Sequence, residues 1–157
     1  MFQQIKTPAW SPWLDKDKQV IEDVQKRFVR MVSGLRSTSY EDKLKELGIL
    51  SLENRRRYFD LIETYKCIKG ISNVKYRTWF TLVGDMVRRE TRGSSSPLNI
   101  VPNRSRLDIR KHFFSSRVVP DWNNLPNEIK ERNSLQSFKN EVKTMLLESG
   151  APTDQGE

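Results

Sequence analysis

Apolar residues recur every three or four positions in the chain, and this spacing constrains the fold more than any other feature. Such spacing places the apolar side chains on one face of an α-helix. In residues 16–35 the stripe comprises Ile21, Val24, Phe28, Met31 and Leu35. The opposite face carries Lys18, Gln25, Lys26 and Arg30, which we interpret as a solvated surface. The pattern therefore predicts an amphipathic helix that packs through its apolar stripe.

Two further helices are predicted, and each has recognisable ends. Ser39 and Ser51 are suited to cap helix N-termini, and Gly48 and Gly70 are suited to end the two helices. The apolar positions of these helices are Tyr40, Leu44, Leu47, Tyr58, Leu61, Ile62, Tyr65 and Ile68. Because the connections are short, the three helices are expected to form a small bundle over residues 13–71, after a lead-in at residues 1–12.

Residues 72–147 are predicted to hold a basic loop, a β-hairpin and C-terminal helices. The loop is the Gly/Ser-rich stretch VRRETRGSSSP, and the hairpin pairs PLNIVP with LDIRKHFF. The last helix starts after Ser134, with apolar residues at Leu135, Phe138, Val142 and Met145. Residues 148–157 read as a disordered tail. The predicted fold class is therefore mainly α; the alternative is a partly disordered fragment whose core needs a partner.

The stretch HFFSSRVVPDWNNLP at residues 112–126 is the most apolar part of the second half. Phe114, Val118, Trp122 and Leu125 fall at near-helical spacing, which favours a packed core. The alternative is an aromatic platform that stacks nucleic-acid bases, built from Trp122 or Phe113 between arginines. We expect the core role.

The positive charge is concentrated, and it points to a polyanionic partner. The chain has 28 Lys and Arg against 20 Asp and Glu, a formal net charge of +8. Residues 88–117 have only Glu90 and Asp108 against eight basic residues: Arg88, Arg89, Arg92, Arg104, Arg106, Arg110, Lys111 and Arg117. Arginine suits bidentate phosphate contact, so this segment is the predicted nucleic-acid-binding region. The run Arg55–Arg57 is a second candidate, or else a solvated helix surface.

Residues for metal or covalent chemistry are few. Cys67 is the one cysteine and His112 the one histidine, so neither an intramolecular disulfide nor a Cys/His zinc cluster can form. Cys67 lies on an apolar helix face and is expected to be a buried thiol. No cofactor is predicted. No apolar run approaches the ~20 residues of a membrane span, and an intracellular location without membrane contact is expected.

One nuclease-like pattern is present. Pro120-Asp121 followed by Glu128-Ile129-Lys130 imitates the PD…(D/E)xK arrangement, in which two carboxylates hold a divalent ion beside a lysine. Those groups usually come from adjacent strands, whereas here Pro126 intervenes after a turn. A metal-dependent nuclease is therefore an alternative that the spacing disfavours.

The order of the segments resembles the C-terminal region of reverse transcriptases from jockey-like and chicken-repeat-like non-LTR retrotransposons. The matching pieces, over roughly residues 10–147, are WSPWLDKDKQVIEDVQKRFVRMV, SYEDKLKELGILSLENRRRYFDLIETYKCIKG, TRGSSSPLNIVPNRSR, HFFSSRVVPDWNNLPNEI and SLQSFKNEVKTML. The resemblance marks a structural signature at Phe113, Phe114, Arg117, Trp122, Asn123, Leu125, Pro126, Phe138 and Lys139.

The resemblance implies a thumb-like N-terminal bundle and a role in holding template and primer. The expected partners are RNA or an RNA–DNA duplex and the palm domain of the parent protein, and the expected location is the nucleus or cytoplasm. The chain departs from the family because it has no Asp-Asp pair of the kind that binds the two palm metals. Mg²⁺ is thus expected only for the full-length parent polymerase, and this chain is expected to be inactive alone. A stand-alone nucleic-acid-binding protein derived from such an element is the alternative.

Overall fold

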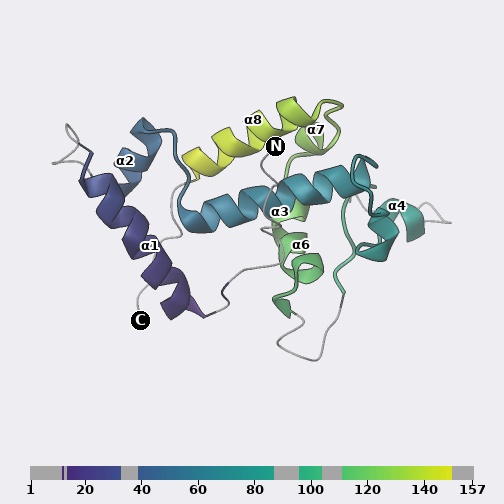
Figure 1. Ribbon diagram of the computed structural model, residues 1–157. Coiled ribbons are helices and arrows are strands. Elements are labelled where there is room, and N and C mark those ends of the chain that lie inside the picture. Colours follow the sequence, from purple (N-terminus) through teal and green to yellow (C-terminus); the bar gives the residue numbers. More distant parts are fainter. Residues whose placement is uncertain (1–11, 13, 33–38, 87–95, 104–110, 150–157) are drawn as a thin grey trace.

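The computed structural model describes residues 12, 14–32, 39–86, 96–103 and 111–149. The longest helix in this part of the chain is α3 (Leu52–Ile68), which lies at the centre. It packs against α6 (Phe114–Asn124) and α8 (Leu135–Glu148), which lie on different sides of it (Figure 1). These three helices form the main body of the molecule, and α3 is distant in sequence from the other two.

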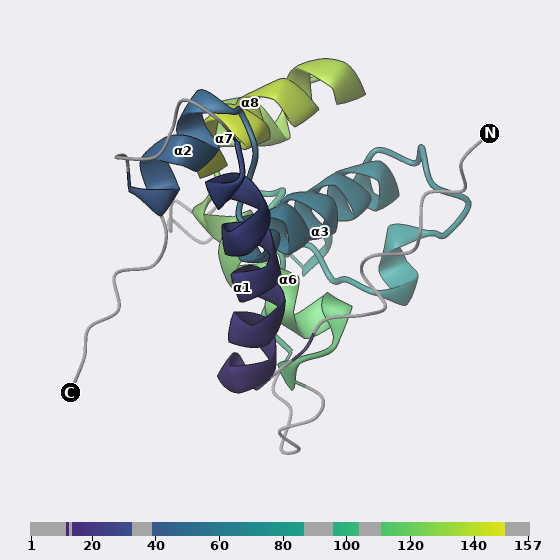
Figure 2. The ribbon, with the colours of Figure 1, turned by 60° about the vertical axis from the view of Figure 1, so that its left-hand side comes forward.

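The remaining elements lie at the two ends of α3. Near its N-terminus are α1 (Asp15–Arg30) and α2 (Tyr40–Glu46), and Figure 2 shows α1 at the front of that end. Near its C-terminus are the short helix η2 (Tyr76–Thr78) and α4 (Val83–Met86). The turn α7 (Asn127–Lys130) connects α6 to α8. The described chain is mainly helical, as the sequence predicts.

The predicted helix ends are confirmed by their hydrogen bonds. The hydroxyls of Ser39, Ser51 and Ser134 each accept a bond from a backbone N–H three residues later, which satisfies a donor that the first turn leaves free. After α2 and α3, Gly48 and Gly70 have φ angles of +61° and +68°. A side chain at that φ is strained, so glycine ends both helices.

The core lies where α3, α6 and α8 meet. The rings of Tyr65, Trp122 and Phe138 are fully buried, and the Tyr65 and Phe138 rings stack with their centroids 4.1 Å apart. Val118 and Leu125 join the same cluster, and Phe114 packs against its edge. The core role predicted for residues 114–125 is confirmed. Since the cluster takes residues from both sides of residue 71, the N-terminal helices share their core with the C-terminal ones.

Side-chain bonds to backbone carbonyls tie α3 to α8 at both ends. Near the start of α3, Asn54 Nδ2 donates to the carbonyl of Leu146 at 3.1 Å, and near its end the Tyr65 hydroxyl donates to the carbonyl of Arg132. The start of one helix therefore lies beside the end of the other, and the pair is antiparallel.

The described residues do not show the predicted hairpin. Ile100 makes one antiparallel bridge, and its partner is Leu82 rather than a residue of the following stretch. Residues 111–113 are not extended, and Phe114 begins α6; residues 104–110 lie outside the described part of the chain. Leu82 and Ile100 are both buried, and Ile100 is 2% exposed. Burial of these two apolar side chains favours this pairing, and Phe114, the last residue of the expected second strand, begins α6 instead.

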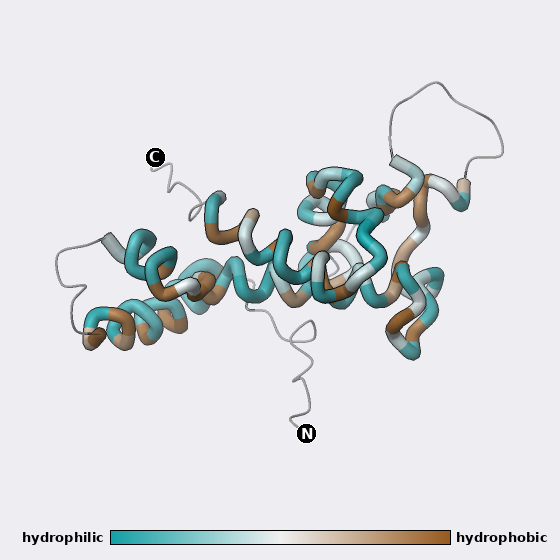
Figure 3. Tube along the Cα trace, turned by 90° about the horizontal axis from the view of Figure 1, so that it is seen from above, coloured by the Kyte–Doolittle hydropathy of each residue, from teal (hydrophilic) through white to brown (hydrophobic). Residues whose placement is uncertain are grey.

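The apolar stripe predicted to pack in the first helix faces outward instead. Val24, Phe28 and Met31 are 63%, 66% and 79% exposed, whereas Val29 is buried. Hydrophobic and hydrophilic residues alternate in short stretches along the helices (Figure 3). The helix packs through its polar side: Glu22 accepts a bond from the backbone N–H of Leu52, and Gln25 donates to the carbonyl of Leu50. The turn before α3 exposes backbone groups that need hydrogen-bond partners, and α1 supplies them.

Candidate nucleic-acid interface

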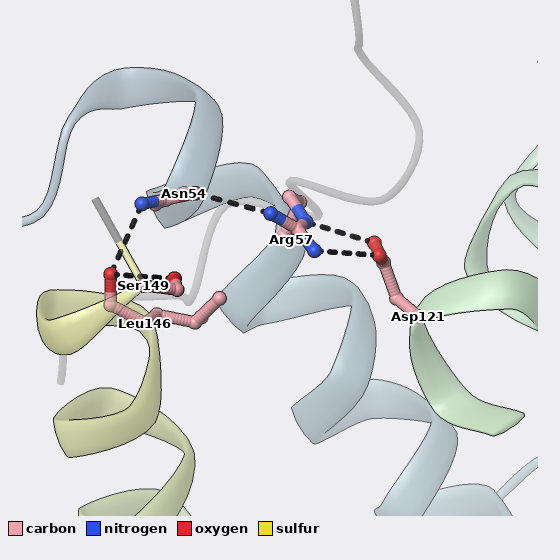
Figure 4. Close-up of polar contacts among 5 residues, drawn as sticks. All are labelled: Asn54, Arg57, Asp121, Leu146 and Ser149. Atoms are coloured by element: carbon pink, nitrogen blue, oxygen red, sulfur yellow. Dashed lines mark hydrogen bonds and ion pairs between the residues drawn. The ribbon is translucent and has the colours of Figure 1, made fainter. Parts of the chain in front are cut away.

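Arg57, one of the predicted phosphate contacts, is bound to a carboxylate within the chain. Its Nη2 and Nε atoms lie 2.8 Å and 3.1 Å from the two carboxylate oxygens of Asp121, and its Nη1 donates to Asn54 Oδ1 (Figure 4). The bond to Asp121 holds the pKa of Arg57 above its ordinary value. The bidentate pair joins α3 to α6, and Asn54 extends the connection to Leu146 in α8.

Arg117 makes an equivalent pair one helical turn away. Its Nε and Nη2 atoms lie 2.8 Å and 3.0 Å from the two oxygens of Asp60, and its Nη1 donates to the carbonyl of His112 at 3.1 Å. The Asp60 side chain is 8% exposed. Burial raises the pKa of Asp60, and Arg117 opposes that shift. The two ion pairs run in parallel between α3 and α6, so these arginines hold the core helices together.

Three predicted phosphate contacts remain accessible in the described part. Arg55 and Lys111 are exposed, whereas Arg56 is half-buried. The Nη2 atom of Arg56 is buried and has no hydrogen-bond partner among the described residues. The other predicted contacts lie outside the described residues: Arg88, Arg89, Arg92, Arg104, Arg106 and Arg110.

The described segments on either side of the first basic stretch are hydrogen-bonded to each other. Backbone N–H groups of Val83 and Gly84 donate to the carbonyls of Asn99 and Pro97 at 2.8 Å and 3.0 Å. A Cβ atom on Gly84 would lie 3.1 Å from the Pro97 carbonyl oxygen, so the close approach needs glycine. The chain therefore leaves and re-enters the described fold at neighbouring points, with Arg88, Arg89 and Arg92 in between.

Side chains of the family-like signature hold the re-entering segment in place. Trp122 Nε1 donates to the carbonyl of Leu98 at 2.8 Å. Asn123 accepts from the N–H of Ile100 at 2.8 Å and donates to its carbonyl at 2.9 Å. The segment is thereby paired with α6 as it would be with a neighbouring strand. We call Trp122, Asn123 and Lys130 together the clamp.

Lys130 completes the clamp from α7. The residue is 1% exposed, and its ammonium group donates to Asn99 Oδ1 at 2.8 Å and to the carbonyl of Asn123 at 3.2 Å. Burial lowers the pKa of Lys130. Two acceptors hold the cation, and they join the clamped segment to the end of α6.

The residues of the nuclease-like pattern are bound to separate partners. Asp121 pairs with Arg57, Lys130 belongs to the clamp, and Glu128 is exposed. Among the described residues, no group of three or more His, Cys, Asp or Glu side chains is placed to hold a metal ion.

The other signature residues divide into core and surface. Leu125 and Phe138 belong to the core, and Phe114 packs against it; Lys139 is half-buried, and Pro126 is exposed. Of the two residues considered as a base-stacking platform, Trp122 is fully buried, whereas Phe113 is 58% exposed.

The Cys67 thiol is buried, as predicted from its place on an apolar helix face. Burial raises its pKa. Among the described helices, none is long and apolar enough to cross a membrane.

Sequence reasoning overlooked the partners of the two arginines and the role of Lys130. A signal for the first was present, because Asp60 interrupts the apolar stripe beside Leu61 and Ile62. A charge at such a position requires a buried counter-charge. For Lys130 the local sequence carries no comparable signal, since its acceptors come from Asn99 and from the end of α6.

Comparison of the chain with protein-family models, with curated proteins and with solved structures finds no match in any of the three.

Proposed function

We propose that the chain binds nucleic acid as the thumb and C-terminal segment of a non-LTR retrotransposon reverse transcriptase, without a polymerase active site of its own. The observation that carries the proposal is the concentration of arginine residues between two segments that are hydrogen-bonded to each other. Arg88, Arg89 and Arg92 lie in sequence between Gly84 and Pro97, whose backbones are hydrogen-bonded at 3.0 Å. A group of cations tied to one place on a scaffold can contact several adjacent phosphates.

The two ion pairs refine which cations take part. Arg57 and Arg117 already bind carboxylates, and bringing them to phosphate would leave Asp121 and the buried Asp60 without a counter-charge. We therefore assign the phosphate contacts to the arginines of residues 88–110, together with Arg55 and Lys111. Sequence preference should be weak, because phosphate contacts carry no base information.

A salt titration of RNA binding tests this assignment. Neutralising Z phosphates makes log K fall against log salt with a slope of roughly 0.7Z for a single strand and 0.9Z for B-DNA. The triple variant Arg88→Gln, Arg89→Gln, Arg92→Gln should flatten this slope by about two to three units on any RNA sequence.

The matched control removes three exposed cations elsewhere, with Lys16→Gln, Lys45→Gln and Lys143→Gln. It changes the net charge equally but should leave the slope nearly unchanged. Equal flattening by both variants would mean that net charge alone attracts the RNA, and no flattening by the first would place the contacts elsewhere.

A stand-alone nucleic-acid-binding protein is the second candidate. It is favoured by the self-contained core of α3, α6 and α8, in which Tyr65, Trp122 and Phe138 are fully buried. Thermal unfolding followed by circular dichroism separates the two candidates: a cooperative transition fits a stand-alone protein, and a flat trace fits a fragment that needs the palm.

A further inference from the structure

We propose that α1 is a self-association surface, through which two copies of the chain pair with their α1 helices antiparallel. The contact is a stripe of four apolar residues that we call the α1 stripe: Val20, Val24, Phe28 and Met31. Their exposed fractions are 66%, 63%, 66% and 79%. Large apolar side chains in one exposed row are characteristic of an interaction site.

The spacing of the α1 stripe matches a helix–helix seam. The steps between its members are four, four and three residues, so they lie along one face of a helix. The intramolecular contacts of α1 use the opposite face, where Val29 is 1% exposed and Glu22 and Gln25 bond to the α2–α3 region. Pairing through the stripe therefore leaves the fold of each chain unchanged.

The charges on α1 argue for a second copy and for its direction. In its first half, residues 15–22, the helix carries Asp15, Asp17 and Glu22 against Lys16 and Lys18, a net charge of −1; in its second half, residues 23–30, it carries Lys26, Arg27 and Arg30 against Asp23, a net charge of +2. A parallel copy would place halves of the same net charge side by side, whereas an antiparallel copy does not.

One residue pair defines the expected register. Asp23 and Arg27 each precede a member of the stripe by one residue, so both lie along the same flank of it. A two-fold axis level with residue 25, midway between Asp23 and Arg27, brings this flank of one copy beside the same flank of the other. Asp23 of each chain then faces Arg27 of the other.

The interface is small, and the association should be weak and reversible. The 16 residues of α1 span about 24 Å, and only one face of the helix takes part. Such a contact lies below the standard size of a stable interface, so dimers should form only towards high protein concentration.

Sedimentation equilibrium of the full chain over a wide concentration range tests the proposal. The wild type should show a monomer–dimer equilibrium, and the variant Val24→Ser, Phe28→Ser should stay monomeric. Both side chains are exposed, so the circular dichroism spectrum and melting curve of that variant should match the wild type. A wild type that is monomeric throughout, or a variant that dimerises equally, overturns the proposal.

Charge exchange tests the antiparallel register. Asp23→Lys alone and Arg27→Glu alone should each dimerise about tenfold more weakly, because two attractive pairs become repulsive. An equimolar mixture of the two variants should associate as well as wild type, because every facing pair is again opposite in sign. If the mixture associates no better than either variant alone, the antiparallel pairing is wrong.

Discussion

The two arginine–aspartate pairs between α3 and α6 show how a single residue can be mistaken for a ligand contact. Arg57 and Arg117 belong to basic runs in the sequence, yet each lies against a carboxylate at 2.8 Å. The Arg117–Asp60 pair is the more buried, with side-chain exposures of 19% and 8%. Removing one partner of such a pair strands the other charge, so the loss exceeds that of a surface salt bridge.

Arg117→Met should lower the free energy of unfolding by about 3 kcal/mol at neutral pH. Burial raises the pKa of Asp60, so the folded chain binds this proton more tightly than the unfolded chain does. The contribution of the Asp60 carboxyl to the free energy of unfolding therefore falls as the pH rises through that raised pKa. Arg117 opposes the rise in the pKa of Asp60, so removal of Arg117 should make this loss of stability with pH steeper. The Arg117→Met variant should therefore lose less stability in acid than at neutral pH.

Urea titrations at several pH values measure this effect. The control is the double variant Arg117→Met, Asp60→Asn, which has no carboxyl to titrate and should show the same loss at every pH. If the single variant Arg117→Met loses the same stability at every pH, then its effect does not come from an unpaired Asp60 carboxylate.

Trp122→Ala should act on stability rather than on RNA binding. Trp122 is fully buried beside Phe138, with the ring centroids 6.2 Å apart. Truncation of a buried Trp costs about 3–5 kcal/mol, a large fraction of the stability of a domain this size.

Trp122→Phe is the matched control, because it keeps most of the buried volume but leaves the Leu98 carbonyl without its donor. It should cost about 1–3 kcal/mol by chemical denaturation. If Trp122→Ala melts like wild type and loses RNA affinity, then the indole is a binding group after all.

At the scale of elements, two sets of bonds hold residues 97–101 in place. The backbone of this segment bonds to residues 81–84, with one bridge to Leu82, and the clamp adds bonds from Trp122, Asn123 and Lys130. The amide side chain of Asn123 bonds both backbone groups of Ile100, which a neighbouring strand would otherwise do.

Asn123→Ala should free this segment locally. The Ile100 amide loses its acceptor, so its hydrogen exchange should speed up by roughly tenfold or more, for a lost bond of about 1–3 kcal/mol. The amide of Leu61 in the middle of α3 serves as the internal control and should exchange as in wild type. Equal acceleration at both amides would mean that the substitution destabilises the whole fold.

For the whole molecule, burial is uneven along the chain. Among the described residues of α1, only Val29 is buried, whereas α3 has seven buried residues. Local stability follows the number of buried contacts, so α1 should open at lower free energy than the central helices. The α1 stripe proposed for self-association thus lies on a long helix that contributes one buried residue to the fold.

Native-state hydrogen exchange at low protein concentration checks this order. Amides of α1 should exchange through local openings that need less free energy than global unfolding. Amides of α3 around Tyr65 should exchange only through global unfolding. Raising the protein concentration should slow exchange in α1 if the helices pair. Uniform protection across α1 and α3 at low concentration would show one cooperative unit instead.

The sequence by itself determined where α1, α2, α3 and α8 lie and where several of them end. Caps such as Ser39 and Ser51 and the terminating residues Gly48 and Gly70 act on backbone groups a few residues away. Such local interactions are present in the sequence whatever the rest of the chain does. The core face of residues 114–125 was predictable for a similar reason, since no other face of that helix is as apolar.

Only the tertiary structure decided which face of α1 packs, which stretch pairs with Ile100 and which arginines are already bound. Each outcome depends on a partner distant in sequence. Glu22 bonds Leu52, Leu82 pairs with Ile100, and Asp60 binds Arg117. A buried backbone group or charge must find a partner, and nothing in the local sequence identifies that partner.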